Sequence, residues 1–314
     1  MQYRTLGSTG LQVSALSYGA SSLGSVFRAV NEEEGIRTVH AALDLGINYI
    51  DVSPYYGLTK AETLLGQALR TVPRDRYLLS TKAGRYGENQ FDFSASRIRS
   101  SLDESLLRLG VDYVDLLFLH DIEFVSSDII FEEAIPTLQA LKQEGKIRFS
   151  GISGLPLDTF THILDNAHVD AILSYCHYSL NDTSLLDMLS YLKQKGVSLV
   201  NASPLSMGLL NGKPLPEWHP ATDQMRLICK RAADHCAERG KDLAKLAVQY
   251  SVQDERIPTT LVSTANPDNI AKNAKWLDKP IDQELLSEVL DILQPIHNMS
   301  WKSGLPEYNR HIQL

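Results

Sequence analysis

Four polar residues stand at or just after the ends of short apolar segments. Asp51 ends Asn-Tyr-Ile-Asp, Tyr56 follows five residues later, Lys82 ends Tyr-Leu-Leu-Ser-Thr-Lys, and His120 ends Val-Asp-Leu-Leu-Phe-Leu-His. A phenol has a reference pKa of about 10 and exchanges protons poorly near neutrality. A buried lysine beside the tyrosine would lower the pKa of the phenol, and an aspartate beside the lysine would keep the lysine charged. With a histidine that orients a substrate oxygen, this group could exchange a proton with a carbonyl or an alcohol, which is half of a hydride transfer.

Each of these residues, taken alone, also has a purely structural interpretation. A single Lys–Asp pair is more often a structural ion pair, a single histidine near a strand end more often packs in the core, and a single tyrosine usually packs as well. The order of the four residues along the chain, and their shared placement at strand ends, favour chemistry.

Parallel strands must position these residues, because the carboxyl ends of such strands meet at one edge of a sheet. Eight segments have the apolar character of strands, and helical segments alternate with them. No Pro-, Gly- or Ser-rich linker divides the chain, so the alternation predicts an α/β fold, a single (β/α)8 TIM barrel over residues 1–314. The expected strands are Leu16–Gly19, Asn48–Asp51, Tyr77–Lys82, Val114–His120, Phe149–Ile152, Ala171–Tyr175, Ser198–Asn201 and Thr260–Ser263.

The segment after Phe93 shows the helical pattern most clearly. Ile98, Leu102 and Leu106 form an apolar stripe at helical spacing, Ser94 is a suitable N-cap, and Gly110 is a suitable stop. The expected barrel helices are Glu32–Leu45, Lys60–Leu69, Ser94–Leu109, Ile135–Gln143, Leu157–Leu164, Ser184–Lys195, Lys241–Val252 and Asn266–Leu277. A β-hairpin over Tyr3–Ala15, an extra helix near Met225–Arg239 and a C-terminal segment from Gln283 are expected as additions to the barrel.

The composition favours a globular protein with a small ligand. Hydrophobic residues make up 43% of the 314 residues and charged residues 22%, and the net charge is -8. No cluster of Lys and Arg is present, which argues against nucleic acid and against a membrane surface as partners. Cys229 and Cys236 lie about 10 Å apart along one helical pattern, too far for a disulfide, and the N-terminus has no features of a signal or transit peptide. We therefore expect a cytoplasmic protein.

Metal binding is not expected, because no His-x-x-x-His motif or clustered Cys/His spacing occurs. The oligomeric state stays open, since one chain reveals no interface. The partner expected from composition alone is a small molecule that is neutral or modestly polar.

The four residues, taken in order, resemble a known family. Asp51-x4-Tyr56-Gly57, then Lys82, then His120, is similar to the tetrad of the aldo-keto reductases, as are the N-terminal hairpin and the stretch 203–205. The resemblance covers almost the whole chain and implies a (β/α)8 barrel with a nicotinamide dinucleotide across its carboxyl end. It implies that Tyr56 is the acid/base, that Lys82 and Asp51 tune it, and that His120 orients the substrate.

Longer segments resemble those members of the family that oxidise sugars. They are residues 24–27, 53–57, 120–124, 172–178 and 216–221. The reaction implied is NAD-dependent oxidation of an aldose at C1 to an aldonolactone. The expected substrate is therefore a small sugar, with L-galactose as the first candidate. Two alternatives stay open: a reductase of small aldehydes that uses NAD(P)H, and a non-catalytic subunit that binds the cofactor.

Two substitutions relative to the family pattern indicate which dinucleotide is bound. In NADP-using members a Lys-Ser pair and then an Arg follow the last strand and hold the ribose 2′-phosphate. Here Ser263 stands at the Lys position and Asn269 at the Arg position, so the phosphate would lack charge-assisted hydrogen bonds. NAD is therefore the expected cofactor, unless Lys272 in the same helix points towards the ribose. The run Gly19–Gly24 lacks the central glycine of Gly-x-Gly-x-x-Gly, which disfavours a doubly wound dehydrogenase.

The resemblance also implies the remaining cofactor contacts. Gly208 would allow close backbone approach in the loop that carries the pyrophosphate, and Asn273 would reach the adenine edge. Gly154 replaces the usual Asn after Ser153, and Tyr175 replaces a Gln that commonly holds the nicotinamide amide. The expected cofactor-binding residues are Ser153, Tyr175, Ser203, Leu205, Gly208, Ser263, Thr264, Asn269 and Asn273.

Overall fold

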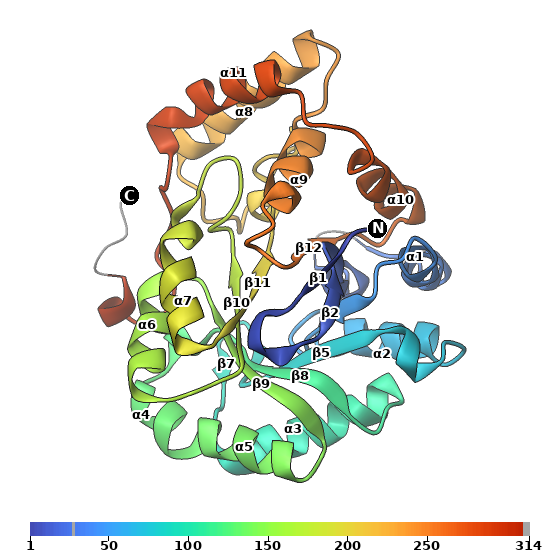
Figure 1. Cartoon of the computed structure of the whole chain (residues 1–314), viewed down its shortest axis with the longest axis vertical. Coiled ribbons are helices and arrows are strands. Elements are labelled where there is room, and N and C mark those ends of the chain that lie inside the picture. The colour runs from blue at the N-terminus through green and yellow to red at the C-terminus, as the bar shows by residue number, and fades with distance from the viewer. Residues whose placement is uncertain (27–28, 310–314) are drawn as a thin grey trace.

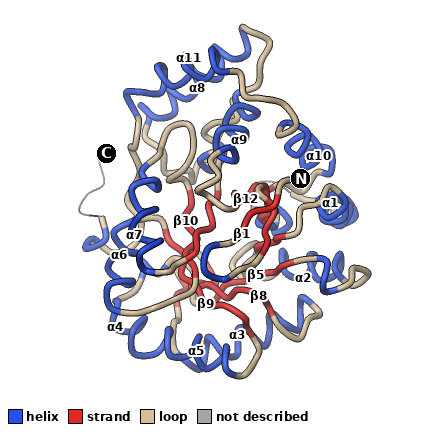
Figure 2. Tube along the Cα trace, viewed as in Figure 1, coloured by secondary structure: helices blue, strands red, loops and turns tan. Residues whose placement is uncertain are grey.

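The computed structural model describes residues 1–26 and 29–309, and eight parallel strands in it close into a barrel (Figure 1, Figure 2). The predicted (β/α)8 fold is confirmed, and all eight expected strands are present. Residues 27–28 and 310–314 of the predicted domain lie outside the described part. In barrel order the strands are β3 (Leu16–Gly19), β4 (Tyr49–Asp51), β5 (Leu78–Ala83), β8 (Val114–Leu119), β9 (Ile147–Gly154), β10 (Ala171–Tyr175), β11 (Ser198–Ala202) and β12 (Thr260–Ser263), and β12 pairs with β3.

Helices surround the barrel (Figure 2), and α3 (Ala95–Leu109) shows how the sequence sets their ends. Ser94 accepts a hydrogen bond from the amide of Arg97, and Gly110 ends the helix in the left-handed conformation with a φ of 69°. Ile98 and Leu102 are buried. The other barrel helices are α1 (Glu32–Asp44), α2 (Lys60–Leu69), α5 (Ile135–Gln143), α6 (Leu157–Asn166), α7 (Leu189–Lys195), α9 (Leu243–Gln253) and α10 (Pro267–Trp276); a short α4 (Ser127–Ile129) and a π-helical turn, Ile130–Ala134, precede α5.

Two further helices, α8 (Asp223–Glu238) and α11 (Gln283–Leu293), pack against each other at the top of the view in Figure 1. They are the predicted additions to the barrel. Among residues 1–26 and 29–309, no helix is both long enough and apolar enough to cross a membrane.

The N-terminal hairpin, β1 (Tyr3–Thr5) and β2 (Gln12–Ser14), covers the amino ends of the strands. The amide of Ser14 donates to the side chain of Asn48 just before β4, and the Ser198 hydroxyl at the start of β11 donates to the carbonyl of Leu6. Leu6 and Val13 are buried in the same apolar cluster as Phe118 of β8. The hairpin therefore closes the barrel at the end away from the predicted tetrad.

A second hairpin, β6 (Arg85–Gly87) and β7 (Gln90–Phe91), follows β5 and was not predicted. Its strands are too short to show a period in the sequence. The Phe91 ring stacks on the ring of Phe124, with 4.5 Å between centroids and 8° between planes. Phe124 belongs to a 3-10 turn, Ile122–Phe124, just after β8. The contact places β6 and β7 beside the carboxyl end of the barrel.

Candidate active site

The four predicted tetrad residues meet at the carboxyl ends of β4, β5 and β8. The Lys82 ammonium group donates hydrogen bonds to Asp51 and, at 3.1 Å, to the hydroxyl oxygen of Tyr56. The ring of His120 lies edge-on to the ring of Tyr56, with 5.6 Å between centroids. Lys82 is 1% exposed and Asp51 3%. The structure thus brings together a phenol, a buried ion pair and an imidazole.

Lys82 is charged, as the sequence suggested. Burial alone lowers the pKa of its ammonium group, but Asp51 and Tyr56 together raise that pKa above its ordinary value. Asp51 is itself held in place, because the Ser80 hydroxyl donates to its second carboxylate oxygen at 2.6 Å. The ion pair therefore supplies a fixed positive charge to Tyr56.

Lys82 acts on the Tyr56 phenol in the expected direction, because it lowers the pKa of that group, but the other surroundings of the ring outweigh its effect. Burial raises the pKa of Tyr56 above its ordinary value, and Lys82 opposes that change without outweighing it. Asp51 raises the pKa further. Removing a charged phenolate from water costs more free energy than its attraction to the neighbouring ammonium group supplies. Tyr56 is consequently a protonated phenol at neutral pH.

His120 is a neutral imidazole. Burial, followed by the charges of Lys82 and Arg85, lowers its pKa well below the ordinary value. Its Nδ1 lies 3.0 Å from the hydroxyl oxygen of Ser53, and Ser53 also accepts a hydrogen bond from the amide of Tyr55 at 3.1 Å. A fixed neutral imidazole can hydrogen-bond a substrate oxygen without adding charge.

Buried Asp121 and half-buried Arg85 form a second ion pair beside His120 that sequence reasoning missed. Arg85 Nη1 lies 2.5 Å from Asp121 Oδ2, and that oxygen lies 3.7 Å from Nε2 of His120. The Arg85 guanidinium group also donates to the hydroxyl of Tyr55 at 3.1 Å. The positions of the two residues could have predicted that they lie near the tetrad. Asp121 directly follows His120, and Arg85 lies three residues after Lys82.

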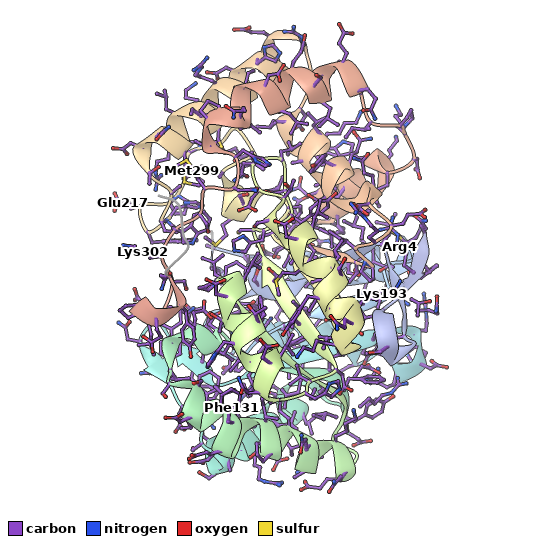
Figure 3. All side chains as sticks on the ribbon, turned by 60° about the vertical axis from the view of Figure 1, so that its left-hand side comes forward. Arg4, Phe131, Lys193, Glu217, Met299 and Lys302 are labelled. Atoms are coloured by element: carbon purple, nitrogen blue, oxygen red, sulfur yellow. The ribbon has the colours of Figure 1, made fainter. Side chains whose placement is uncertain are left out.

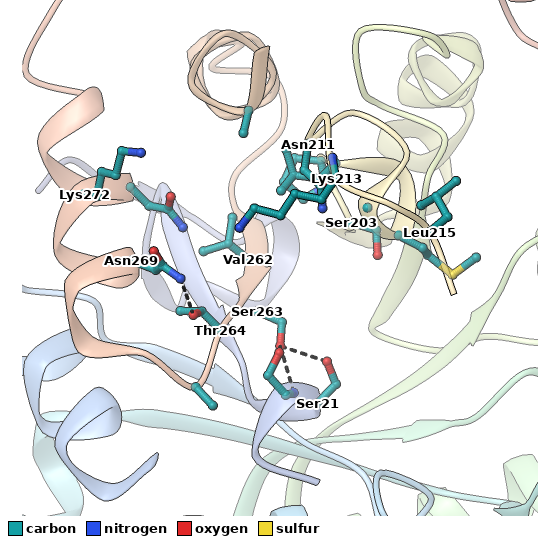
Figure 4. Close-up of a pocket in the computed structure, with 18 of the residues that line it drawn as sticks. Ser21, Ser203, Asn211, Lys213, Leu215, Val262, Ser263, Thr264, Asn269 and Lys272 are labelled. Atoms are coloured by element: carbon teal, nitrogen blue, oxygen red, sulfur yellow. Dashed lines mark hydrogen bonds between the residues drawn. The ribbon is translucent and has the colours of Figure 1, made fainter. Parts of the chain in front are cut away.

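A cleft of about 470 Å³ opens at the carboxyl ends of β11 and β12, and Figure 4 shows its lining. Gly208 in this lining has a φ of 104°, a backbone conformation that favours glycine. Seven of the nine residues predicted to bind the cofactor lie here: Ser203, Leu205, Gly208, Ser263, Thr264, Asn269 and Asn273.

The other two predicted cofactor residues lie elsewhere, at the ends of β9 and β10. The Ser153 hydroxyl donates to the carbonyl of Leu119 at 3.3 Å. Tyr175 is half-buried, and burial together with the nearby carboxyl groups of Asp121 and Glu123 raises its pKa well above the ordinary value. Neither residue belongs to the lining of the 470 Å³ cleft.

The loop after β3 forms one wall of this cleft and was missed as a binding element. Ser263 accepts hydrogen bonds from the hydroxyl of Ser21 at 2.9 Å and from the amide of Ser22 at 3.0 Å. Both serines lie in the run Gly19–Gly24, which attracted attention in the sequence only for its missing glycine. Ser263 thus joins the loop to β12.

Two lysines line the cleft, and one of them is paired. Lys272 lies 3.1 Å from a carboxylate oxygen of Asp242, and its ammonium group lies 5.0 Å from the centroid of the Trp276 ring. No ion pair involves Lys213 within the described part of the chain. In Figure 4 the Lys213 side chain extends into the cleft. Within the same described ranges, no group of three or more His, Cys, Asp or Glu residues could hold a metal ion.

Comparisons with known proteins agree with this geometry. A family model described as the aldo/keto reductase family matches residues 15–294. The L-galactose dehydrogenase of Arabidopsis thaliana is 52% identical, over 97% of this chain and 98% of that protein. The D-arabinose 1-dehydrogenase of Saccharomyces cerevisiae is 35% identical, over 84% and 86%. A solved aldo-keto reductase from Bacillus halodurans, in its holo form, superposes with a TM-score of 0.76 at 26% identity, over 99% of this chain and all of that one.

Proposed function

Because the chain belongs to the aldo/keto reductase family, we propose that it is a sugar dehydrogenase that oxidises an aldose at C1 to the aldonolactone. L-galactose is the first candidate for this aldose. The observation that carries this proposal is the 3.1 Å hydrogen bond from Lys82 to Tyr56 beside a neutral His120. The choice of sugar rests on the 52% identity to a protein named L-galactose dehydrogenase.

The family binds a nicotinamide cofactor, and the cleft at the ends of β11 and β12 fits a dinucleotide. Its lining combines small and polar side chains with Gly208, where the backbone can approach a pyrophosphate closely. Lys213 would add positive charge there. When bound, the nicotinamide supplies the acceptor for the hydride that leaves C1 of the sugar.

The residues of the tetrad then have separate tasks in moving the proton. Tyr56 first releases its own proton to solvent, and the fixed charge of Lys82 stabilises the phenolate that forms; this phenolate then takes the proton of the anomeric hydroxyl. Asp51 keeps Lys82 protonated. His120, as a neutral imidazole whose ring lies edge-on to that of Tyr56, orients the sugar oxygen.

We infer NAD as the cofactor. Ser263 and Asn269 carry no charge for a 2′-phosphate, and Ser263 is already engaged with Ser21. Asn269 lies 3.5 Å from the hydroxyl of Thr264, to which it donates. Lys272 lines the cleft, but its ammonium group is paired with Asp242. An added phosphate would therefore find no charged side chain at positions 263 and 269, and the nearby Lys272 is already paired with Asp242.

A double variant, Ser263→Lys with Asn269→Arg, tests this inference. A charge-assisted hydrogen bond contributes about 1.5–3 kcal/mol, so we expect the ratio of NADP to NAD affinity to rise at least about tenfold. The measurement is the dissociation constant of each cofactor by fluorescence titration. The matched control is Ser263→Gln with Asn269→Gln, which adds length without charge. An equal ratio in both double variants would contradict the role given to these two positions.

The function itself is tested by initial rates of reduced-cofactor formation with L-galactose, L-fucose and D-galactose, each with NAD and with NADP. We expect rapid formation of NADH with L-galactose. Activity with none of the sugars, but consumption of NADPH with small aldehydes, would support the reductase alternative instead. Cofactor binding without any turnover would support a non-catalytic subunit.

A further inference from the structure

Glu123 is a buried carboxyl group that the proposed reaction does not use. It lies in the turn Ile122–Phe124 just after β8, three residues beyond His120, and is 0% exposed. One carboxyl oxygen, Oε1, accepts a hydrogen bond from the amide of Leu155 at 3.1 Å and another from the hydroxyl of Ser303 at 2.8 Å. The side chain therefore joins the end of β9 to the C-terminal segment, 180 residues further along the chain.

The C-terminal segment is shaped to fit this turn. The amide of Leu305 donates to the backbone carbonyl of Glu123 at 2.7 Å. Gly304 has a φ of 71°, and a Cβ there would lie 2.1 Å from the same carbonyl oxygen. Asn309 closes the segment, because its side chain donates to the carbonyls of Ser303 and Leu305, both at 2.8 Å. In Figure 3, Met299 and Lys302, which lead into the segment, lie on the same flank as Glu217.

Glu123 also packs closely against a second glycine, Gly154, on the side away from Gly304. A Cβ at Gly154, at the end of β9, would lie 2.6 Å from Glu123 Oε2. The carboxyl group of Glu123 therefore occupies space that a side chain at 154 would need. Glu123 is thus packed between two glycines, Gly154 and Gly304.

The surroundings of Glu123 favour a neutral acid. Within the described residues no cation pairs with it, and Oε2 has no hydrogen-bond partner. The ionisable groups that face it are Asp121 from its own turn and Tyr175 from β10, while Arg85 from β6 is bonded to Asp121. Leu155 and Ser303 supply only uncharged donors. Burial, and then the charge of Asp121, raise the pKa of Glu123 to about 8.

We propose that Glu123 is a positioning residue: as a neutral acid it fastens the segment Ser303–Asn309 to the ends of β8 and β9, and its ionisation loosens that segment. The same fastening fixes Asp121, two residues away, beside His120 and Arg85. This second consequence rests on the proposed function, because it concerns the side of the site that would receive the sugar.

The direction of the pH effect follows from the raised pKa. Between the ordinary pKa of a glutamate and about 8, the folded chain holds a proton that the unfolded chain has released, so the stability that Glu123 contributes falls as the pH rises. Above about pH 8 the folded chain must bury a carboxylate without a cation, which costs free energy. Local opening of the C-terminal segment relieves that cost by admitting water.

Hydrogen exchange of the full chain tests the proposal without cofactor or sugar. The quantity is the protection of the amides in residues 303–309, corrected for the intrinsic pH dependence of exchange, at pH 7 and pH 9. In the native sequence we expect protection to fall about tenfold between these values, because with a pKa of about 8 the fraction of carboxylate grows about tenfold from pH 7 to pH 9. Glu123→Gln keeps the oxygen acceptor but cannot ionise, so its protection should stay constant. The matched control is Glu307→Gln, which removes an exposed carboxyl group from the same segment and should behave like the native sequence.

Equal pH responses in the native chain and Glu123→Gln, or no response in either, would overturn the proposal. Gly304→Ala provides a second test if Glu123→Gln fails to fold. The added methyl group collides with the Glu123 carbonyl, so protection of residues 303–309 should be low at both pH values, and native-like protection would also overturn the proposal. In the active enzyme, KM for the sugar should rise between pH 7 and pH 9 more in the native chain than in Glu123→Gln. A chain that shows the exchange result but oxidises no sugar keeps the positioning role and loses the proposed function.

Discussion

Tyr56→Phe should lower kcat at least about 1,000-fold, while the dissociation constant of the cofactor changes less than about threefold. General acid–base catalysis contributes about 100- to 10,000-fold, and the substitution removes the hydroxyl group that Lys82 contacts at 3.1 Å. The ring stays, so its edge contact with His120 is retained. The measurements are steady-state kinetics with the best sugar and a fluorescence titration of the cofactor.

Tyr55→Phe is the matched control for this variant. Tyr55 is the neighbouring tyrosine, and its hydroxyl accepts a hydrogen bond from Arg85 instead of Lys82. We expect a change within about tenfold in kcat, because this hydroxyl lies outside the proton-transfer group. Near-native turnover in Tyr56→Phe would show that another group exchanges the proton. An equal loss in both variants would indicate general damage to this end of the barrel.

The sequence predicted the barrel well because buried parallel strands have a strong local signal. An apolar run that ends in a polar residue marks the carboxyl end of a strand, and Lys82 and His120 follow this pattern on β5 and β8. The tetrad could be predicted from the sequence for the same reason. Once the strands lie side by side in chain order, residues at their carboxyl ends must meet. Differences at the strand ends are small, as in β9, which starts at Ile147 instead of Phe149.

Features that depend on packing between distant segments could not be predicted. The strands of the hairpin β6–β7 are too short to show the alternation of a strand in the sequence. The contact between Phe91 and Phe124 places this hairpin beside the site. The direction of Lys272 is set by Asp242, 30 residues away. The raised pKa of Tyr56 follows from burial, which the sequence does not report. Glu123 lies in the segment 120–124 that carries part of the resemblance, but its contact with Ser303 could not be predicted, because that partner is 180 residues away.

Lys82→Met should cost both activity and stability, for separate reasons. The variant removes the charge that stabilises the phenolate, so we expect kcat to fall at least about 1,000-fold. It also leaves Asp51 as a buried carboxylate without its cation, which lowers the free energy of unfolding by about 3–5 kcal/mol. Kinetics and chemical denaturation measure the two effects. The control is Lys302→Met, an exposed lysine whose loss should affect neither.

The double variant Lys82→Met with Asp51→Asn separates chemistry from structure. Asparagine keeps the shape of Asp51 and can still accept the hydrogen bond of Ser80 while carrying no charge. Replacing both members of a buried ion pair with neutral residues is often neutral for stability, so most of the lost unfolding free energy should return. Turnover should not return, because no cation then faces Tyr56. If the double variant recovers both stability and turnover, Lys82 and Asp51 form only a structural ion pair. This is the interpretation that a single Lys–Asp pair in the sequence would favour. If stability returns alone, the charge of Lys82 acts on the reaction itself.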